Sequence, residues 1–395
     1  MTIDRVLTLC IAGVLFIAWL VCWFSHVMSL IYGKWLLHRA PQDLSPEDMQ
    51  GVSIIKPLTG VDPNLKTNLT TFFNSSYPAF EILFSVQDEQ DPAILLVKSL
   101  MEAYPKVDAK LFIGIKSVGA NGKVNNMVKA YEAAKYDIVL VSDSGIRMQE
   151  STLTGMMACM TSKVGMVLQM PYVADREGFA AVYEKVYFGT MQARNCLAAN
   201  ALGINCSTGM SCLMRKDILD AAGGMASFGK YLAEDFFFAE AFRQRGYKVV
   251  LCPEPALQNL GTYSIGEFHR RLIRWCHLRI SMLPTLILLE PISECMIIGV
   301  GASFAIQHLF DVSASVVFLL HILCWFLLDY TLITTVENGP LKFSKFEFLV
   351  AWFMREMLVV YVFIQCHRTR TITWRNKVYR LRWGGLAEEI KSEVV

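Results

Sequence analysis

Acidic side chains follow two of the strands that the sequence predicts. Asp88 and Asp91 come after the apolar run 82–86, and Asp143 comes after the run 138–141. In a mostly parallel sheet, ligands bind beyond the carboxyl ends of the strands, so we expect these three acids at the ligand edge. Carboxylates in such a place can hold a cation or take up a proton.

Two later segments add a fourth acid and a basic, aromatic motif. Asp235 opens a predicted helix, and Arg271, Arg274 and Trp275 lie on another one. Residues three and four apart on a helix are neighbours, so the two arginines and the tryptophan should share a face.

These residue types suit the transfer of a sugar from a nucleotide diphosphate to an alcohol. A divalent cation held by Asp143, together with an arginine, could neutralise the diphosphate leaving group. Asp235 could accept the proton of the attacking alcohol. Trp275 could wall the sugar or the acceptor and keep water from the donor.

Each of these residues also has a purely structural explanation. Asp91 before Pro92 is a good helix N-cap, and Asp143-Ser-Gly is a common turn after a strand. Asp235 suits the positive end of a helix, and the arginine face could be solvated or lie at a membrane surface. Because the set occurs in the order that one chemistry needs, we favour the catalytic interpretation.

The elements around these acids follow a βαβ rhythm. Asp62-Pro63 and Asp91-Pro92 predict helix starts, each with an acidic N-cap. We therefore predict a doubly wound, mostly parallel α/β domain over residues 51–262. Its strands are expected at residues 52–55, 82–86, 111–115, 138–141, 164–170, 211–214 and 249–252.

An apolar segment at residues 6–32 is long enough to cross a bilayer, so we predict an N-terminal transmembrane anchor over residues 1–33. It is followed by a linker at 34–50. Lys34, His38 and Arg39 after the segment outnumber the single arginine before it, which predicts that the following domain lies in the cytosol.

A second membrane region is predicted at residues 284–366, after an amphipathic interfacial helix at 263–283. It has three apolar stretches, and the number of crossings stays open because one is short and another contains Arg355-Glu356. A basic tail at 367–395 favours the cytosol, whereas three crossings would place it in the lumen. The apolar stretches are 295–310, 312–336 and 346–366.

Composition agrees with a membrane enzyme of a reducing compartment. The mean hydropathy is positive, and the net charge of +2 gives no reason to expect a nucleic acid partner. The eleven cysteines form no CxxC pair and predict no disulfide framework, so we interpret them mainly as small buried apolar residues.

With these motifs in place, the chain resembles the inverting glycosyltransferases of GT-A fold, a Rossmann-like α/β class, and most closely their ceramide-glucosylating branch. The matching segments are 51–58 (Gly-Val-Ser-Ile-Ile-Lys-Pro-Leu), 60–65, 143–147 (Asp-Ser-Gly-Ile-Arg), 171–176, 208–216 and 290–295.

The resemblance implies UDP-glucose as donor, ceramide as acceptor, Mg²⁺ or Mn²⁺ as cofactor, and a multi-pass Golgi membrane protein with its catalytic domain in the cytosol. It also implies a role for each site residue. By this resemblance, the donor would be bound by Asp88, Asp91, Lys123 and Asp143, and the metal would be held by Asp143. Asp235 would be the general base. The pyrophosphate and the acceptor would be bound by Arg271, Arg274 and Trp275. Lys123 could equally be a surface lysine, and either Asp88 or Asp91 could contact the uridine.

Two departures from the family pattern stand out. Asp143-Ser-Gly replaces the Asp-x-Asp of many relatives, so the metal lacks an obvious second carboxylate. Gln192 stands where the vertebrate-type pattern has a histidine.

The alternative functions are a processive polysaccharide synthase, which needs more membrane helices, and an inactive scaffold or lipid-binding protein, which predicts loss of a motif. A transporter fits less well, because a polar α/β domain interrupts the membrane segments.

Overall fold

The computed structural model describes residues 3–40, 44, 49–174, 176–261, 264–369, 371–374 and 377–390. Parts of several predicted segments fall outside these ranges: residues 1–2 of the anchor, 41–43 and 45–48 of the linker, Asp175 of the motif at 171–176, residue 262 of the α/β domain, residue 263 of the interfacial helix, and residues 370, 375–376 and 391–395 of the tail. The chain divides into two compact units, which are described separately. The helical unit is Met1–Trp35, Glu177–Ala201 and Ser264–Arg370, and the sheet unit is Leu36–Arg176, Leu202–Tyr263 and Thr371–Val395.

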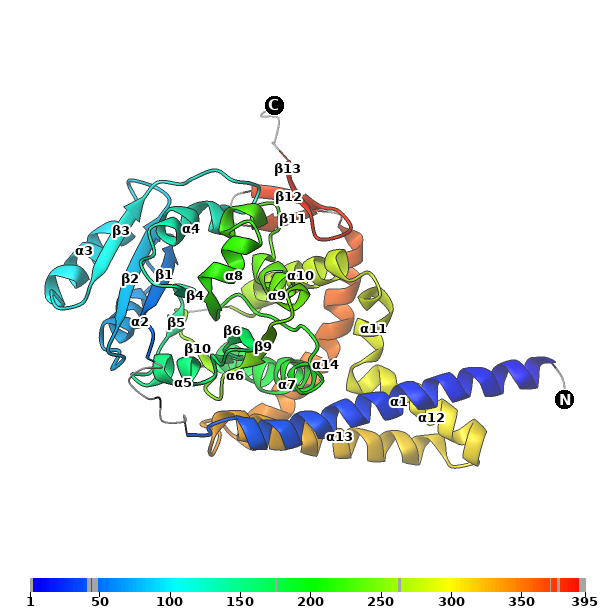
Figure 1. The fold of residues 1–395 in the computed structure, drawn as a ribbon. Coiled ribbons are helices and arrows are strands. Elements are labelled where there is room, and N and C mark those ends of the chain that lie inside the picture. The colour runs from blue at the N-terminus through cyan, green and yellow to red at the C-terminus, as the bar shows by residue number, and fades with distance from the viewer. Residues whose placement is uncertain are drawn as a thin grey trace. The chain divides into compact units, whose positions relative to one another are not determined.

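A seven-stranded sheet forms the centre of the sheet unit, with strand order β3-β2-β1-β4-β8-β6-β9 (Figure 1). β8 runs antiparallel to both of its neighbours and the other pairs are parallel, so the predicted mostly parallel sheet is confirmed. The strands are β1 (Val52–Leu58), β2 (Phe80–Val86), β3 (Ala109–Ile113), β4 (Ile138–Ser142), β6 (Val164–Leu168), β8 (Ser211–Arg215) and β9 (Lys248–Leu251).

The central strands are apolar because helices cover the sheet. Val52, Ile54 and Ile55 of β1 are fully buried, as expected for a parallel strand covered on both faces. The strand predicted at 111–115 is shifted, since β3 begins at Ala109 and ends at Ile113. The helices of this unit are α2 (Leu65–Phe73), α3 (Ala93–Ala103), α4 (Gly122–Glu132), α5 (Thr152–Ala158), α8 (Lys216–Ala221), the short 3-10 helix η2 (Met225–Phe228) and α9 (Glu234–Gln244).

The two Asp-Pro helix starts lie slightly before the helices that they predict. α2 begins at Leu65 and α3 at Ala93, so the predicted starts at Pro63 and Pro92 are wrong by two residues and one residue. The acids still satisfy first-turn amides. Asp91 Oδ1 accepts a hydrogen bond from the Ala93 N–H at 2.9 Å.

Strands also form where a basic tail was predicted. The segment folds into a three-stranded antiparallel sheet of β11 (Thr371–Trp374), β12 (Lys377–Leu381) and β13 (Ala387–Ile390), and it belongs to the sheet unit. The prediction of a tail is therefore wrong for this segment. A further small sheet has the order β5-β10-β7, from β5 (Ile146–Arg147), β7 (Pro171–Val173) and β10 (Ala256–Gln258).

A helix forms at every predicted apolar stretch, and these helices belong to the helical unit. By length and composition, α1 (Ile3–Leu36) and α13 (Ala314–Glu337) could cross a membrane, whereas α12 (Cys295–Phe310) is shorter. α12 and α13 pack together, and α14 packs against α6 and α10. The remaining helices are α6 (Phe179–Tyr187), the π-helix η1 (Phe188–Gln192), α7 (Ala193–Ala201), α10 (Ile265–Met282), α11 (Leu286–Ile292) and α14 (Lys345–Arg368).

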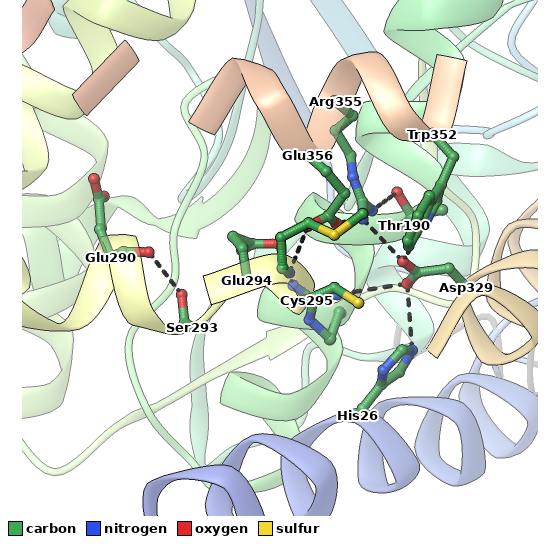
Figure 2. Close-up of polar contacts among 12 residues, drawn as sticks. His26, Thr190, Glu290, Ser293, Glu294, Cys295, Asp329, Trp352, Arg355 and Glu356 are labelled. Atoms are coloured by element: carbon green, nitrogen blue, oxygen red, sulfur yellow. Dashed lines mark hydrogen bonds and ion pairs between the residues drawn. The ribbon is translucent and has the colours of Figure 1, made fainter. Parts of the chain in front are cut away.

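Charged side chains meet inside the helical unit (Figure 2). Asp329 of α13 is fully buried and lies 3.0 Å from an Arg355 nitrogen, 3.4 Å from Arg194 and 3.3 Å from His26 Nε2. Arg355 also bonds Glu356. We call Arg194, Glu294, Asp329, Arg355 and Glu356 the helix cluster; all five are buried, and each has an oppositely charged or hydrogen-bonding neighbour.

The cysteine prediction holds only in part. All eleven thiols are free, and Cys196, Cys212 and Cys276 are among the buried ones. Cys10 and Cys324 are exposed on α1 and α13, so the interpretation of these two as buried residues is wrong. They lie on helix faces that carry other exposed apolar side chains, which explains how they occur in apolar runs.

Candidate active site

Lys123 is the centre of a charged cluster in the sheet unit. Asn121 caps α4 by accepting hydrogen bonds from the N–H groups of Lys123 and Val124, so the lysine lies in the first turn. Its Nζ lies 2.8 Å from Asp143 Oδ1 and 3.1 Å from Glu234 Oε1, and it donates to the Gly209 carbonyl at 2.9 Å.

Lys123 remains charged in spite of its burial. Burial alone would lower the pKa of this ammonium, but Asp143 and Glu234 outweigh burial and raise the pKa above its ordinary value. A fixed positive charge at the end of a sheet can stabilise the negative charge of a diphosphate. The alternative interpretation of Lys123 as a surface residue is wrong, because its side chain is only 12% exposed.

Asp143 directly follows β4, as predicted, and keeps an open side. Its side chain is 40% exposed although Lys123 contacts one of its oxygens. The backbone beneath it is held by the buried Lys56, whose Nζ donates to the Asp143 carbonyl at 2.7 Å. Burial lowers the pKa of Lys56 to about 7, while Asp143 opposes that change. Asp143 therefore presents a carboxylate outward from a fixed backbone.

Asp235 lies in the first turn of α9, beside Glu234. The pKa of Asp235 is raised to about 7, because burial and the negative charge of Glu234 raise it more than Lys123 lowers it. A carboxylate with a pKa near the working pH is suited to general base catalysis. Gly209 gives it room, because a Cβ at that position would lie 3.2 Å from the Asp235 Cβ and Cγ.

We call Lys123, Asp143, Glu234 and Asp235 the catalytic cluster. Among the described residues, no group of three or more His, Cys, Asp or Glu side chains could hold a metal ion. The open carboxylate of Asp143 is nevertheless a suitable hard ligand. A cation here fits if phosphate oxygens of a donor and water supply its remaining ligands.

Asp88 and Asp91 lie just past β2, as predicted, but their surroundings differ. Both oxygens of Asp91 are occupied by backbone amides, since Oδ1 accepts from Ala93 and Oδ2 accepts from the Gly60 N–H at 2.8 Å. Asp88 is exposed and lines an open hollow of about 430 Å³. The hollow is lined by Gln87, Asp88, Glu89, Gln90 and Ile115.

The basic, aromatic motif lies on α10 in the helical unit. The Arg271 guanidinium lies 4.5 Å from the centre of the Trp275 ring, and Glu184 is 3.4 Å from the guanidinium. Arg271, Arg274 and Trp275 are all half-buried. The predicted neighbourhood of Arg271 and Trp275 is therefore confirmed. Phe188 of η1 also contacts the Trp275 ring, at 6.1 Å between centres.

Comparison with known proteins decides the family. The model of glycosyl transferase family 21 matches residues 21–387. Ceramide glucosyltransferase 3 of Caenorhabditis elegans is 43% identical over 385 residues, which cover 97% of this chain and 83% of the relative. Ceramide glucosyltransferase 1 of the same organism is 41% identical, covering 99% and 83%. The chain belongs to glycosyl transferase family 21.

The fold of this family 21 enzyme agrees with a solved structure. The mannosyltransferase PcManGT of Pyrobaculum calidifontis, solved with GDP-Man and Mn²⁺, superposes with a TM-score of 0.52 at 16% identity, covering 91% of this chain and 99% of that one. At that identity the likeness shows the fold alone. The predicted GT-A-like α/β class and the prediction of a glycosyltransferase are thus confirmed.

Sequence reasoning missed three residues that shape the catalytic cluster of this family 21 member. Glu234 contacts Lys123, Lys56 holds the Asp143 backbone, and Gly209 leaves space for Asp235. Lys56 gave a usable signal, because a lysine within an otherwise apolar buried strand is rare. For Gln192, whose amide donates to Cys196 Sγ at 3.3 Å, any role in the reaction stays a prediction.

Proposed function

We propose that this family 21 enzyme transfers glucose from UDP-glucose to the primary hydroxyl of ceramide, with inversion at the anomeric carbon, giving β-glucosylceramide and UDP. The observation that carries the proposal is the catalytic cluster, which combines a carboxylate whose pKa is about 7, a fixed ammonium and an outward-facing carboxylate. Its relatives, named ceramide glucosyltransferases, support the choice of acceptor.

Asp235 would act as the general base. The ceramide hydroxyl becomes nucleophilic as Asp235 takes its proton, and its oxygen attacks the anomeric carbon while the bond to the diphosphate breaks. Inversion follows because attack and departure occur on opposite faces of the sugar in one step. Ionised Asp235 is available at neutral pH because its pKa lies close to that value.

Lys123 and Asp143 would serve the leaving group. Lys123 contributes a positive charge that a departing UDP needs, and the arginines Arg271 and Arg274 add to it. A divalent cation, Mg²⁺ or Mn²⁺, would be held by Asp143 and would neutralise charge on the diphosphate when bound. The exposed Asp88 is the better candidate for a uridine contact, because both oxygens of Asp91 already accept backbone hydrogen bonds.

A membrane location fits a lipid acceptor that remains in the bilayer. α1 and α13 are long and apolar enough to cross it, and the exposed apolar side chains of α1 suit contact with lipid. We propose a Golgi membrane with the catalytic domain in the cytosol, supported by the basic residues after the anchor. α10 would lie at the interface and present Trp275 to lipid substrate or sugar.

The C-terminal sheet is relevant to the side of the membrane on which the basic segment 367–395 lies. β11, β12 and β13 belong to the sheet unit, which supports a topology in which both ends of the segment Ser264–Arg370 face the same side of the bilayer. The segment would then cross an even number of times. A cytosolic tail then agrees with its basic residues.

The test measures transfer of radiolabelled sugar from UDP-glucose or UDP-galactose to ceramide in membranes containing the protein, with and without EDTA. We expect lipid-extractable product from UDP-glucose alone, and its loss with EDTA. Product from UDP-galactose alone would contradict the donor, and EDTA-resistant transfer would contradict the cation. If neither donor gives a lipid product, radioactivity in the water-insoluble fraction would indicate a polysaccharide synthase, and its absence an inactive protein.

A further inference from the structure

Within the sheet unit, the C-terminal sheet contacts the loop that leads into α9, the helix that carries Asp235. The Ala387 N–H donates to the Lys230 carbonyl at 3.1 Å, and Leu386 forms an antiparallel bridge with Tyr231. Tyr231 lies four positions before Asp235, the proposed base. β13 thus adds a short strand pairing to the loop Gly229–Ala233, which we call the base loop.

The base loop is tied to the catalytic cluster through Asn121. The Asn121 side-chain amide donates to the Tyr231 carbonyl at 2.7 Å and to Glu234 Oε2 at 2.7 Å, and its N–H donates to the Gly229 carbonyl at 2.8 Å. The other Glu234 oxygen contacts Lys123. A displacement of the base loop would therefore move the acceptors of two Asn121 bonds and, through Asn121, disturb Glu234, which contacts Lys123.

Aromatic packing fixes the same loop to α9. The rings of Tyr231 and Phe237 stack with 3.6 Å between their centres, one turn into the helix that carries Asp235. On the other side the backbones approach closely, because a Cβ at Gly119 would lie 2.3 Å from the Gly229 carbonyl carbon. The base loop is thus confined by α9, by the segment before α4 and by β13.

From these contacts we propose that the C-terminal sheet is a positioning element of the transfer site: its Leu386–Ala387 end holds the base loop, and the base loop holds Asn121, Glu234 and Asp235 in their working arrangement. The proposal rests on the proposed role of Asp235. It assigns a function to a segment that contributes no reacting group. Because a catalytic group displaced by about 1 Å can lose two orders of magnitude in rate, a small shift suffices.

Ala387→Pro tests the proposal with limited damage to the C-terminal sheet. The Ala387 N–H points to Lys230 and not to β12, so proline removes the bond to the base loop at a strand position where it is tolerated. Trp383→Pro is the matched control. Gly384 has a φ of 84°, which is typical of the third residue of a type II turn, and proline is favoured just before it.

Turnover is measured per UDP-binding site, together with the KM for UDP-glucose. We expect Ala387→Pro to lose about tenfold or more in turnover while the KM changes by less than about twofold, and Ala387→Ser and Trp383→Pro to match the wild type. Wild-type turnover in Ala387→Pro would overturn the proposal. Equal losses of turnover, UDP binding and thermal stability would also overturn it, because they indicate a merely structural role.

A measurement on the unaltered protein covers the case in which Ala387→Pro fails to fold. Hydrogen exchange should show the peptides 229–238 and 383–390 opening with similar free energy, as one cooperative unit. Fast exchange at 383–390 beside a protected base loop would overturn the proposal. Asp235→Asn separates the two hypotheses: if it remains active, the proposed role of Asp235 as general base fails, whereas an inactive Asp235→Asn beside a fully active Ala387→Pro removes only the positioning role.

Discussion

The helix cluster and the catalytic cluster, both among the described residues, differ in how far their side chains are shielded from solvent. In the helix cluster, Asp329 and Arg355 are both fully buried, and Asp329 accepts contacts from four neighbours: His26, Arg194, Trp352 and Arg355. In the catalytic cluster, Asp143 is 40% exposed and has one ion-pair partner.

The difference indicates what each cluster can do. A closed cluster stabilises one arrangement of helices, and removal of one member leaves a charge without a partner in a place that water does not reach. An open cluster keeps a carboxylate oxygen available for a ligand, and burial gives its Asp235 a raised pKa that suits catalysis. The same residue types thus hold helices together in one unit and, in the proposed mechanism, serve the transfer reaction in the other.

The largest effect on stability is expected from breaking the helix cluster. Arg355→Met leaves Asp329 and Glu356 without their shared partner, so we expect a loss of about 3–5 kcal/mol in the free energy of unfolding. Thermal unfolding in detergent measures it as a lower Tm. Lys345→Met on the same helix is the control, because Lys345 is exposed. An unchanged Tm in Arg355→Met would mean that the cluster contributes nothing to stability.

A change in the catalytic cluster should lower activity and leave stability nearly unchanged. Asp143→Ala removes the outward carboxylate, so we expect transfer to fall by about 10²–10³-fold while the Tm changes little. Titration with Mn²⁺ should also require more cation for half-maximal activity. Asp62→Ala is a useful comparison, since Asp62 also follows a strand of this sheet and accepts hydrogen bonds from the backbone amides of Asn64 and Gly261. Equal losses in the two variants would contradict a special role for Asp143.

A smaller effect is expected in the dependence of transfer on pH. Because Asp235 must be ionised to accept a proton, activity should rise with pH through a midpoint near 7, the pKa of this carboxyl. Glu234→Gln removes the neighbouring negative charge, so the midpoint should move to lower pH by about one unit. The rate is measured between pH 5 and pH 9. A midpoint that stays in place would contradict the influence of Glu234 on Asp235.

The smallest effect is expected on α10. Arg271→Lys keeps the charge but loses the planar contact with Trp275, which is worth about 0.5–1 kcal/mol, so transfer should fall about threefold. Arg270→Lys is the neighbouring control, because Arg270 is exposed. A loss above about a hundredfold would indicate that Arg271 binds the diphosphate directly through a paired guanidinium.

The sequence predicted the sheet and most of the catalytic cluster because both rest on local patterns. Buried parallel strands are continuous apolar runs, and acids directly after them, such as Asp143, are recognised by their position. The C-terminal sheet was missed, because the alternation in β12 is obscured by Lys377 and Arg380. Its pairing with the base loop joins segments more than 150 residues apart, a contact that no local pattern contains.

The contacts of the helix cluster also could not be predicted from the sequence. Arg355 and Glu356 were recognised as unusual within an apolar stretch, but Asp329, the partner of Arg355, comes from α13, and Arg194, which pairs with Asp329 and Glu294, comes from α7. Similarly, Glu234 is one of many acids that open helices, and only its contact with Lys123 distinguishes it. Tertiary packing determines which charges meet, and single-sequence patterns report on it only indirectly.

One measurement compares the two clusters directly: UDP binding, transfer per UDP-binding site and thermal midpoint in Asp235→Asn and Asp329→Asn. The account predicts that Asp235→Asn binds UDP and unfolds at or above the wild-type temperature, yet transfers at least about 10²-fold more slowly. Asp329→Asn should unfold at a lower temperature but retain its transfer rate per binding site. The account would be contradicted if Asp235→Asn transferred normally, or if Asp329→Asn lost transfer without losing stability.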